Sequence, residues 1–141
     1  MRAPECFMDT NILLYAVSTA PAEAPKTDAA RSLLQQTQWG WSAQVAAEFI
    51  RAASSKKNSA MSRAEAAKWV ELWMAYPMMA VDGTMVLEAA ALGERFQISH
   101  FDSQNLVAAK RLGCELVYSE DLGHGQNDGG LQVRNPFLSP S

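Results

Sequence analysis

The sequence predicts an α/β domain in which helices cover both faces of a central, mostly parallel sheet of four to five strands. Short apolar runs that suit buried strands alternate with longer segments of helical periodicity along the whole chain. The 141 residues are near the usual size of one domain, and 48% of them are hydrophobic and 19% charged, as in globular proteins. We therefore expect a single domain over residues 1–141, with a flexible tail at 138–141.

The first strand is expected at residues 6–8, a short apolar run that ends at Asp9. Apolar residues at 12–15 then start a helix, so Asp9 lies where a strand passes into a helix. Two interpretations of Asp9 are open at this point. It either caps the helix, or it belongs to a ligand site, since ligands of open α/β sheets collect at the carboxyl ends of strands.

Local signals define the remaining elements. Ser62 and Glu65 form a capping box, and Leu87, Ala90 and Ala91 are expected on one side of their helix. In order, we expect a helix at 26–38, a strand at 39–41, a helix from Ser42 to about residue 57, a helix from Ser62 that Pro77 stops, a strand at 78–81, a helix at 86–96 capped by Asp82 or Thr84, a helix from Ser99 to Gly113, a strand at 114–118 and a short edge strand at 131–133.

Two acids lie on these helices beside apolar residues. Glu48 falls at the border of the stripe that contains Phe49, and Asp102 faces the same way as Leu106. Each carboxylate is expected either to be paired with another group or to have a functional role, because burial of an unpaired charge is unfavourable. The structural alternative for Glu48 is an ion pair with Arg51, and for Asp102 it is a favourable position in the first helical turn.

The net charge of −3 argues against a nucleic-acid-binding surface over the whole protein, but the charge is unevenly distributed. Residues 51–68 hold five bases and one acid. This segment is either a local phosphate-binding surface or an ordinary solvated helix face.

Other residue types place the chain in a cellular compartment. Cys6 and Cys114 match no zinc pattern and suit buried positions in a reducing environment. No secretory or membrane-spanning segment is evident, so we expect a cytoplasmic protein. His100 and His124 are single residues, expected at surface or capping positions rather than as ligands or bases.

Four acids are expected to converge at one edge of the sheet. Asp9 and Asp121 each follow a strand, and Glu48 and Asp102 lie near the N-terminal ends of helices at that edge. Such carboxylates raise one another's pKa or bind a hard cation such as Mg²⁺ or Mn²⁺. The phosphate-binding loop G-x-x-x-x-G-K-[ST], the G-x-G-x-x-G turn and the G-x-S-x-G motif are absent. Asn11 stands where an aspartyl-nucleophile phosphatase needs a second Asp.

Four segments of the chain resemble the acidic motifs of PIN domains, and they are most similar to VapC-type toxins of bacterial type II toxin–antitoxin systems. The segments are Phe-Met-Asp-Thr-Asn-Ile-Leu-Leu-Tyr-Ala, Ser-Ala-Gln-Val-Ala-Ala-Glu-Phe, His-Phe-Asp-Ser-Gln-Asn-Leu-Val-Ala-Ala and Leu-Val-Tyr-Ser-Glu-Asp-Leu. The resemblance extends to the closing Asn-Pro-Phe. It implies a three-layer α/β/α sandwich, a Mg²⁺- or Mn²⁺-dependent endoribonuclease that often acts on structured RNA such as tRNA, a homodimer, and a cognate antitoxin that blocks the site.

The resemblance assigns roles to individual positions. Those that match the acids are Asp9, Glu48, Asp102 and Asp121, and those that match supporting polar positions are Thr10, Asn11 and Ser119. Glu120 is an extra acid that could compete with Asp121 as a ligand. Our hypothesis is that Asp9 and Asp102 hold the principal ion and that Glu48 and Asp121 complete its shell. The bases expected to guide the RNA backbone are Arg51, Lys56 and Lys57.

Two other functions remain open at this stage. The chain could be a catalytically silent PIN-like module that holds an RNA or an antitoxin, although all four acids are intact, or a metal-dependent DNA nuclease. The helix that carries Trp69 and Trp73 is a candidate dimer surface, with burial in the core as the alternative.

Overall fold

The computed structural model describes residues 3–55, 61–122, 127–128 and 130–138. Predictions for Lys56, Lys57, His124 and the end of the tail at 139–141 lie outside the described residues. The elements are β1 (Cys6–Met8), α1 (Thr10–Val17), the short 3-10 helix η1 (Pro21–Glu23), α2 (Ala24–Gln36), β2 (Trp39–Ser42), α3 (Ala43–Ala53), α4 (Arg63–Trp73), β3 (Met78–Met79), α5 (Gly83–Phe96), α6 (His100–Leu112), β4 (Leu116–Tyr118), β5 (Asn127–Asp128) and β6 (Leu131–Arg134).

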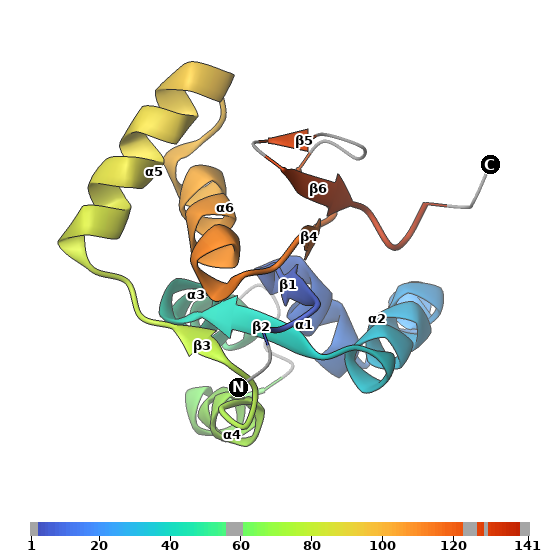
Figure 1. The fold of residues 1–141 in the computed structure, drawn as a ribbon. Coiled ribbons are helices and arrows are strands. Elements are labelled where there is room, and N and C mark those ends of the chain that lie inside the picture. Colours follow the sequence, from blue (N-terminus) through green and yellow to red (C-terminus); the bar gives the residue numbers. More distant parts are fainter. Residues whose placement is uncertain (1–2, 56–60, 123–126, 129, 139–141) are drawn as a thin grey trace.

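The strands form one sheet in the order β3-β2-β1-β4-β6-β5. Neighbours from β3 to β6 pair in parallel, and β5 pairs with β6 antiparallel. Helices α1 to α4 lie on one side of the sheet and α5 and α6 on the other (Figure 1). The predicted α/β/α class is thus confirmed. The strand expected at 131–133 is present as β6, but it is not the edge strand, because β5 pairs with it and takes the edge.

The sheet reverses its winding direction at β1, which lies between β2 and β4. Cys6 lies opposite Leu116 and Met8 opposite Tyr118, so β1 and β4 end at the same level. The next residue, Asp9, donates its backbone N–H to the Tyr118 carbonyl at 3.0 Å. Such a switch point opens a crevice at the carboxyl edge of the sheet, which is where ligands bind in open α/β folds.

A cluster of aromatic side chains fills the core between β2, α3 and α4. Trp39, Trp41 and Phe49 are fully buried, and Trp73 packs edge-on against all three. Trp69 is 38% exposed, so α4 contributes Trp73 to the core and Trp69 to the surface. We call Trp39, Trp41, Phe49 and Trp73 the tryptophan cluster.

Several local predictions need correction. Helix α3 ends at Ala53 instead of near residue 57, and β3 covers only Met78–Met79 of the expected 78–81. Asp82, rather than Thr84, caps α5 by accepting a hydrogen bond from Met85 N. Both cysteines are buried and unpaired, as expected.

The side of α5 that carries Leu87, Ala90 and Ala91 is not the side that packs in the core. These three residues are exposed, whereas Met85 and Ala89 of the same helix are buried. Apolar residues occur on two sides of this helix, and packing against α6 selects only one of them. None of the helices in the described part of the chain is long and apolar enough to cross a membrane.

Candidate metal centre

A pocket of about 220 Å³ opens at the carboxyl edge of the sheet, beside the ends of β1 and β4. All four predicted acids line it, although they come from the end of β1, from α3, from α6 and from the loop after β4. The lining residues are Asp9, Thr10, Asn11, Leu14, Glu48, Arg51, Ala52, Phe101, Asp102, Asn105 and Asp121.

Asp9 is the most buried of the four acids, and of the two interpretations that its sequence position left open the structure shows the helix cap. It is the N-cap of α1, and its Oδ1 accepts hydrogen bonds from Thr10 N at 2.7 Å and from Asn105 Nδ2 at 3.1 Å. Its Oδ2 accepts one from Ser119 Oγ at 2.7 Å. Asp9 is only 5% exposed, and burial raises its pKa to about 6 in spite of these donors. The nearby charges of Asp102 and Asp121 raise it further.

Glu48 is held by neutral donors. Its Oε2 accepts a hydrogen bond from Thr10 Oγ1 at 3.0 Å, and its Oε1 accepts one from Gln44 Nε2 at 2.9 Å. Gln44 in turn accepts a hydrogen bond from Gln104 of α6. The alternative of an ion pair between Glu48 and Arg51 is wrong within the described residues. Arg51 instead stands exposed at the rim of the pocket.

The supporting polar residues bind the acids directly. Asn11 donates from Nδ2 to Asp121 Oδ2 at 3.0 Å. Ser119 is fully buried; besides donating to Asp9, its hydroxyl accepts the backbone N–H of Asp121 at 3.2 Å. Through these bonds the end of β4 and the start of α1 fix the relative positions of two carboxylates.

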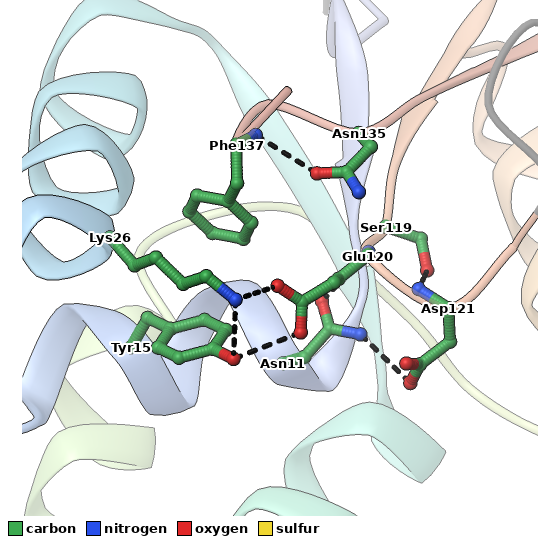
Figure 2. A network of polar contacts seen from close by, with 8 residues as sticks. All are labelled: Asn11, Tyr15, Lys26, Ser119, Glu120, Asp121, Asn135 and Phe137. Carbon is green, nitrogen blue, oxygen red and sulfur yellow. Dashed lines mark hydrogen bonds and ion pairs between the residues drawn. The ribbon is translucent and has the colours of Figure 1, made fainter. Parts of the chain in front are cut away.

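Glu120 turns away from the pocket that its neighbour Asp121 lines. Figure 2 shows the two carboxylates on opposite sides of Asn11. Glu120 accepts a hydrogen bond from Tyr15 Oη at 2.9 Å and forms an ion pair with Lys26. In this arrangement Glu120 does not compete with Asp121 for a ligand in the pocket.

The residues of the pocket fit a hard divalent cation. In the described ranges, no group of three Asp, Glu, His or Cys side chains is placed to hold a metal ion by itself. Asn105 Oδ1, however, is buried without a hydrogen-bond partner in this part of the chain, while its Nδ2 binds Asp9. A free buried amide oxygen beside a buried carboxylate offers the ligand chemistry that Mg²⁺ and Mn²⁺ prefer.

Some residues at this edge were not singled out from sequence. Phe101, which follows His100 at the start of α6, is 61% exposed and lines the pocket. The only available signal was an aromatic residue beside Asp102 in a first helical turn. His100 stays at the surface, as expected, and hydrogen-bonds Gln104 at 3.1 Å.

Comparison with family models identifies the class of protein that this fold and pocket belong to. The PIN domain model matches residues 6–129. The chain therefore belongs to the PIN domain family, as the four acidic segments indicated.

Solved structures with the same fold include a toxin–antitoxin complex and a toxin. A toxin–antitoxin complex from Klebsiella pneumoniae superposes with a TM-score of 0.68 and 16% identity, covering 94% of this chain and 98% of that one. VapC20 of Mycobacterium tuberculosis, described as a sarcin–ricin loop cleaving toxin, superposes with a TM-score of 0.67 and 16% identity, covering 82% of this chain and 91% of that one. FitAcB of Neisseria gonorrhoeae superposes with a TM-score of 0.63 and 14% identity, covering 94% of this chain and 98% of that one. A comparison with curated protein sequences finds no match.

Proposed function

We propose that this protein is a Mg²⁺- or Mn²⁺-dependent endoribonuclease that acts as the toxin of a type II toxin–antitoxin pair and hydrolyses RNA phosphodiester bonds. The observation that carries the proposal is the convergence of four carboxylates, from four separate segments, on one pocket beside the unsatisfied oxygen of Asn105. Membership of the PIN family and the likeness to toxin structures support it.

In this proposal Asp9 and Asp102 hold the principal ion, and Glu48 and Asp121 complete its surroundings directly or through water. A bound divalent ion supplies Lewis acidity and lowers the pKa of water, which is the chemistry that phosphodiester hydrolysis needs. Ser119, Asn11 and Thr10 keep the carboxylates oriented before the ion arrives. Arg51, exposed at the rim, attracts the RNA backbone. Structured RNA such as tRNA is the substrate class that the family resemblance implies.

The proposed partners are a cognate antitoxin and a second copy of the chain. A groove of about 380 Å³ shares Asn11 and Leu14 with the acidic pocket and continues along α1 to Ala53 and Met61, so an antitoxin segment seated there would reach the site. The proposed dimer interface is formed by exposed apolar side chains on two helices. They are Trp69 and Leu72 on α4 and Val86 and Leu87 on α5.

The direct test is cleavage of tRNA and ribosomal RNA fragments with Mg²⁺ or Mn²⁺ by the wild type and by Asp9→Asn and Asp102→Asn. We expect both variants to lose at least about 100-fold in rate while circular dichroism shows an intact fold, because each removes a charged ligand. Glu94→Gln, which removes an exposed carboxylate of α5 outside the pocket, is the matched control and should cleave normally.

Other outcomes identify the rival functions. Retained cleavage in Asp9→Asn would overturn the metal role. Preferential cleavage of single-stranded DNA in parallel assays would indicate a DNA nuclease. Absence of Mg²⁺ and Mn²⁺ binding in titration calorimetry, together with tight RNA or antitoxin binding, would indicate a catalytically silent binding module.

A further inference from the structure

Three side chains beside the acidic pocket form a compact charged cluster. Lys26 of α2 pairs with Glu120 after β4, and Tyr15 of α1 donates to Glu120 Oε1 at 2.9 Å while it accepts from Lys26 Nζ at 3.2 Å. The Lys26 ammonium also lies 4.8 Å from the centre of the Tyr15 ring and 5.5 Å from that of Phe137. Figure 2 shows the Phe137 ring close above this cluster. We call Tyr15, Lys26 and Glu120 the clamp.

The closing Asn-Pro-Phe segment holds the clamp from outside. The Tyr15 and Phe137 rings meet edge to face with centroids 5.0 Å apart, and Phe137 N donates to Asn135 Oδ1 at 2.9 Å. Lys26 and Glu120 keep 42% and 25% of their side-chain surface exposed. An ion pair of this exposure adds little to stability by itself, so its effect on the geometry of its neighbours is the more important consequence.

The clamp is joined to the acidic pocket through Asn11. The backbone N–H of Glu120 donates to Asn11 Oδ1 at 3.3 Å, and Asn11 Nδ2 donates to Asp121 Oδ2 at 3.0 Å. Asn11 also lies one helical turn before Tyr15 on α1. The clamp residues therefore hold Asn11 in two ways. Tyr15 belongs to the helix that carries Asn11, and Glu120 supplies the backbone N–H that the Asn11 side chain accepts.

We propose that Lys26 and Glu120 are positioning residues that hold the segment after β4 against α1, so that Asn11 presents the Asp121 carboxylate to the pocket. This inference rests on the proposed function, because it assigns the clamp to the ion site of that function. It also explains why an acid directly beside Asp121 does not occupy the pocket: its carboxylate is engaged by Lys26 and Tyr15 on the far side of Asn11.

Two rival explanations make the opposite prediction for Lys26. If Glu120 were itself an ion ligand, or if the clamp acted only through its charges, then Lys26→Met would strengthen cation binding, because it removes a positive charge and frees a carboxylate. In the positioning proposal, Lys26→Met weakens cation binding, because the segment that carries Asp121 is no longer held. The sign of the change therefore decides between them.

The experiment is titration calorimetry with Mn²⁺ on the full chain. We expect Lys26→Met and Glu120→Gln each to weaken Mn²⁺ binding by about tenfold, the effect typical of residues that orient metal ligands. The double variant should be no weaker than either single one, and Lys26→Arg should restore binding to near the wild-type level. Glu88→Gln, which breaks the partly exposed Arg111–Glu88 pair of α5 and α6, is the matched control and should bind normally.

Unchanged or tighter binding in Lys26→Met overturns the positioning role, as does an additive loss in the double variant. A second readout separates this failure from failure of the proposed function. In the metal-free protein, Lys26→Met should speed hydrogen exchange at the Glu120 amide, which donates to Asn11. Faster exchange without any Mn²⁺ binding in the wild type would keep the clamp as a structural device and refute its assignment to an ion site. An unchanged exchange rate overturns the clamp itself.

Discussion

The acidic pocket and the tryptophan cluster lie at different parts of the same sheet, and burial has opposite effects on the stability of the fold in the two regions. In the tryptophan cluster, burial of large apolar rings against one another stabilises the fold. In the pocket, burial raises the pKa of Asp9 to about 6, so its charged form destabilises the metal-free fold near neutral pH. Substitutions in the tryptophan cluster should therefore lower the free energy of unfolding. Substitutions in the pocket should instead lower the affinity for the ion, and they can raise the free energy of unfolding of the metal-free protein.

The largest effect on stability is expected from Trp73→Ala. Trp73 is 6% exposed and meets Phe49 and Trp41 with ring centroids 5.0 and 6.0 Å away. Its removal should lower the free energy of unfolding by about 3–5 kcal/mol, measured by urea denaturation. Trp69→Ala on the same helix is the control and should cost much less, because Trp69 is 38% exposed. Equal losses in the two variants would remove the distinction between core and surface on α4.

Asp9→Asn should instead stabilise the metal-free protein at neutral pH. The folded-state pKa of Asp9 is about 6 against an ordinary 3.8, so the protonated form favours folding. The stability that this proton provides is complete below about pH 4 and is lost as pH rises through 6. The variant should therefore gain up to about 3 kcal/mol near pH 7.5, an upper estimate from the pKa difference, and nothing near pH 3.5.

The matched control for this gain is Asp82→Asn. Asp82 caps α5, and its backbone hydrogen bond from Met85 lowers its pKa, so removal of its charge should not stabilise the protein. A loss of stability in Asp9→Asn at neutral pH, measured by urea denaturation, would show that the hydrogen bonds to Asp9 outweigh the cost of its burial.

The affinity for Mg²⁺ or Mn²⁺ should fall with pH. Because a proton must leave Asp9 before an ion binds, affinity should drop by about tenfold per pH unit below about 6. Titration calorimetry between about pH 7 and about pH 5 measures this slope. Asp9→Asn should bind weakly and lose that part of the dependence. A flat profile in the wild type would mean that Asp9 is not at the ion.

The smallest effect is expected from Phe101→Ala, and it contrasts an exposed aromatic residue with the buried ones. Phe101 is 61% exposed and lines the pocket, where a ring can stack on an RNA base. Its removal should weaken RNA binding by roughly fivefold, and Phe101→Trp should retain it. Met74→Ala, at a 62% exposed position at the end of α4, is the control and should not change RNA binding. Unchanged binding in Phe101→Ala, measured by fluorescence anisotropy, would exclude stacking.

Much of the site was predictable because each acid carries a local signal. Asp9 and Asp121 follow apolar strands, and a parallel sheet places strand ends together whatever the side chains elsewhere. The supporting contacts of Thr10, Asn11 and Ser119 followed from the family resemblance and appear as hydrogen bonds to the acids. The catalytic and metal-binding roles of the four acids, and the supporting roles of these three residues, stay predictions.

Other parts could not be predicted because nothing local decides them. Glu48 could pair with Arg51 or face the pocket, and only the packing of α3 beside α1 brings Thr10 to its carboxylate. The buried side of α5 could not be predicted for the same reason, since the helix has apolar residues on two sides and contact with α6 selects one of them.

The sequence by itself determined the alternation of strands and helices, the capping box of Ser62 and Glu65, and the presence of four acids at the carboxyl edge of a sheet. Those features depend on neighbours within a few residues. Only the tertiary structure decided which way adjacent carboxylates face. Glu120 and Asp121 are consecutive, yet Lys26 and Tyr15 hold one away from the pocket while Asn11 holds the other at its rim. Side-chain direction in a loop depends on partners that lie as many as 110 residues away along the chain.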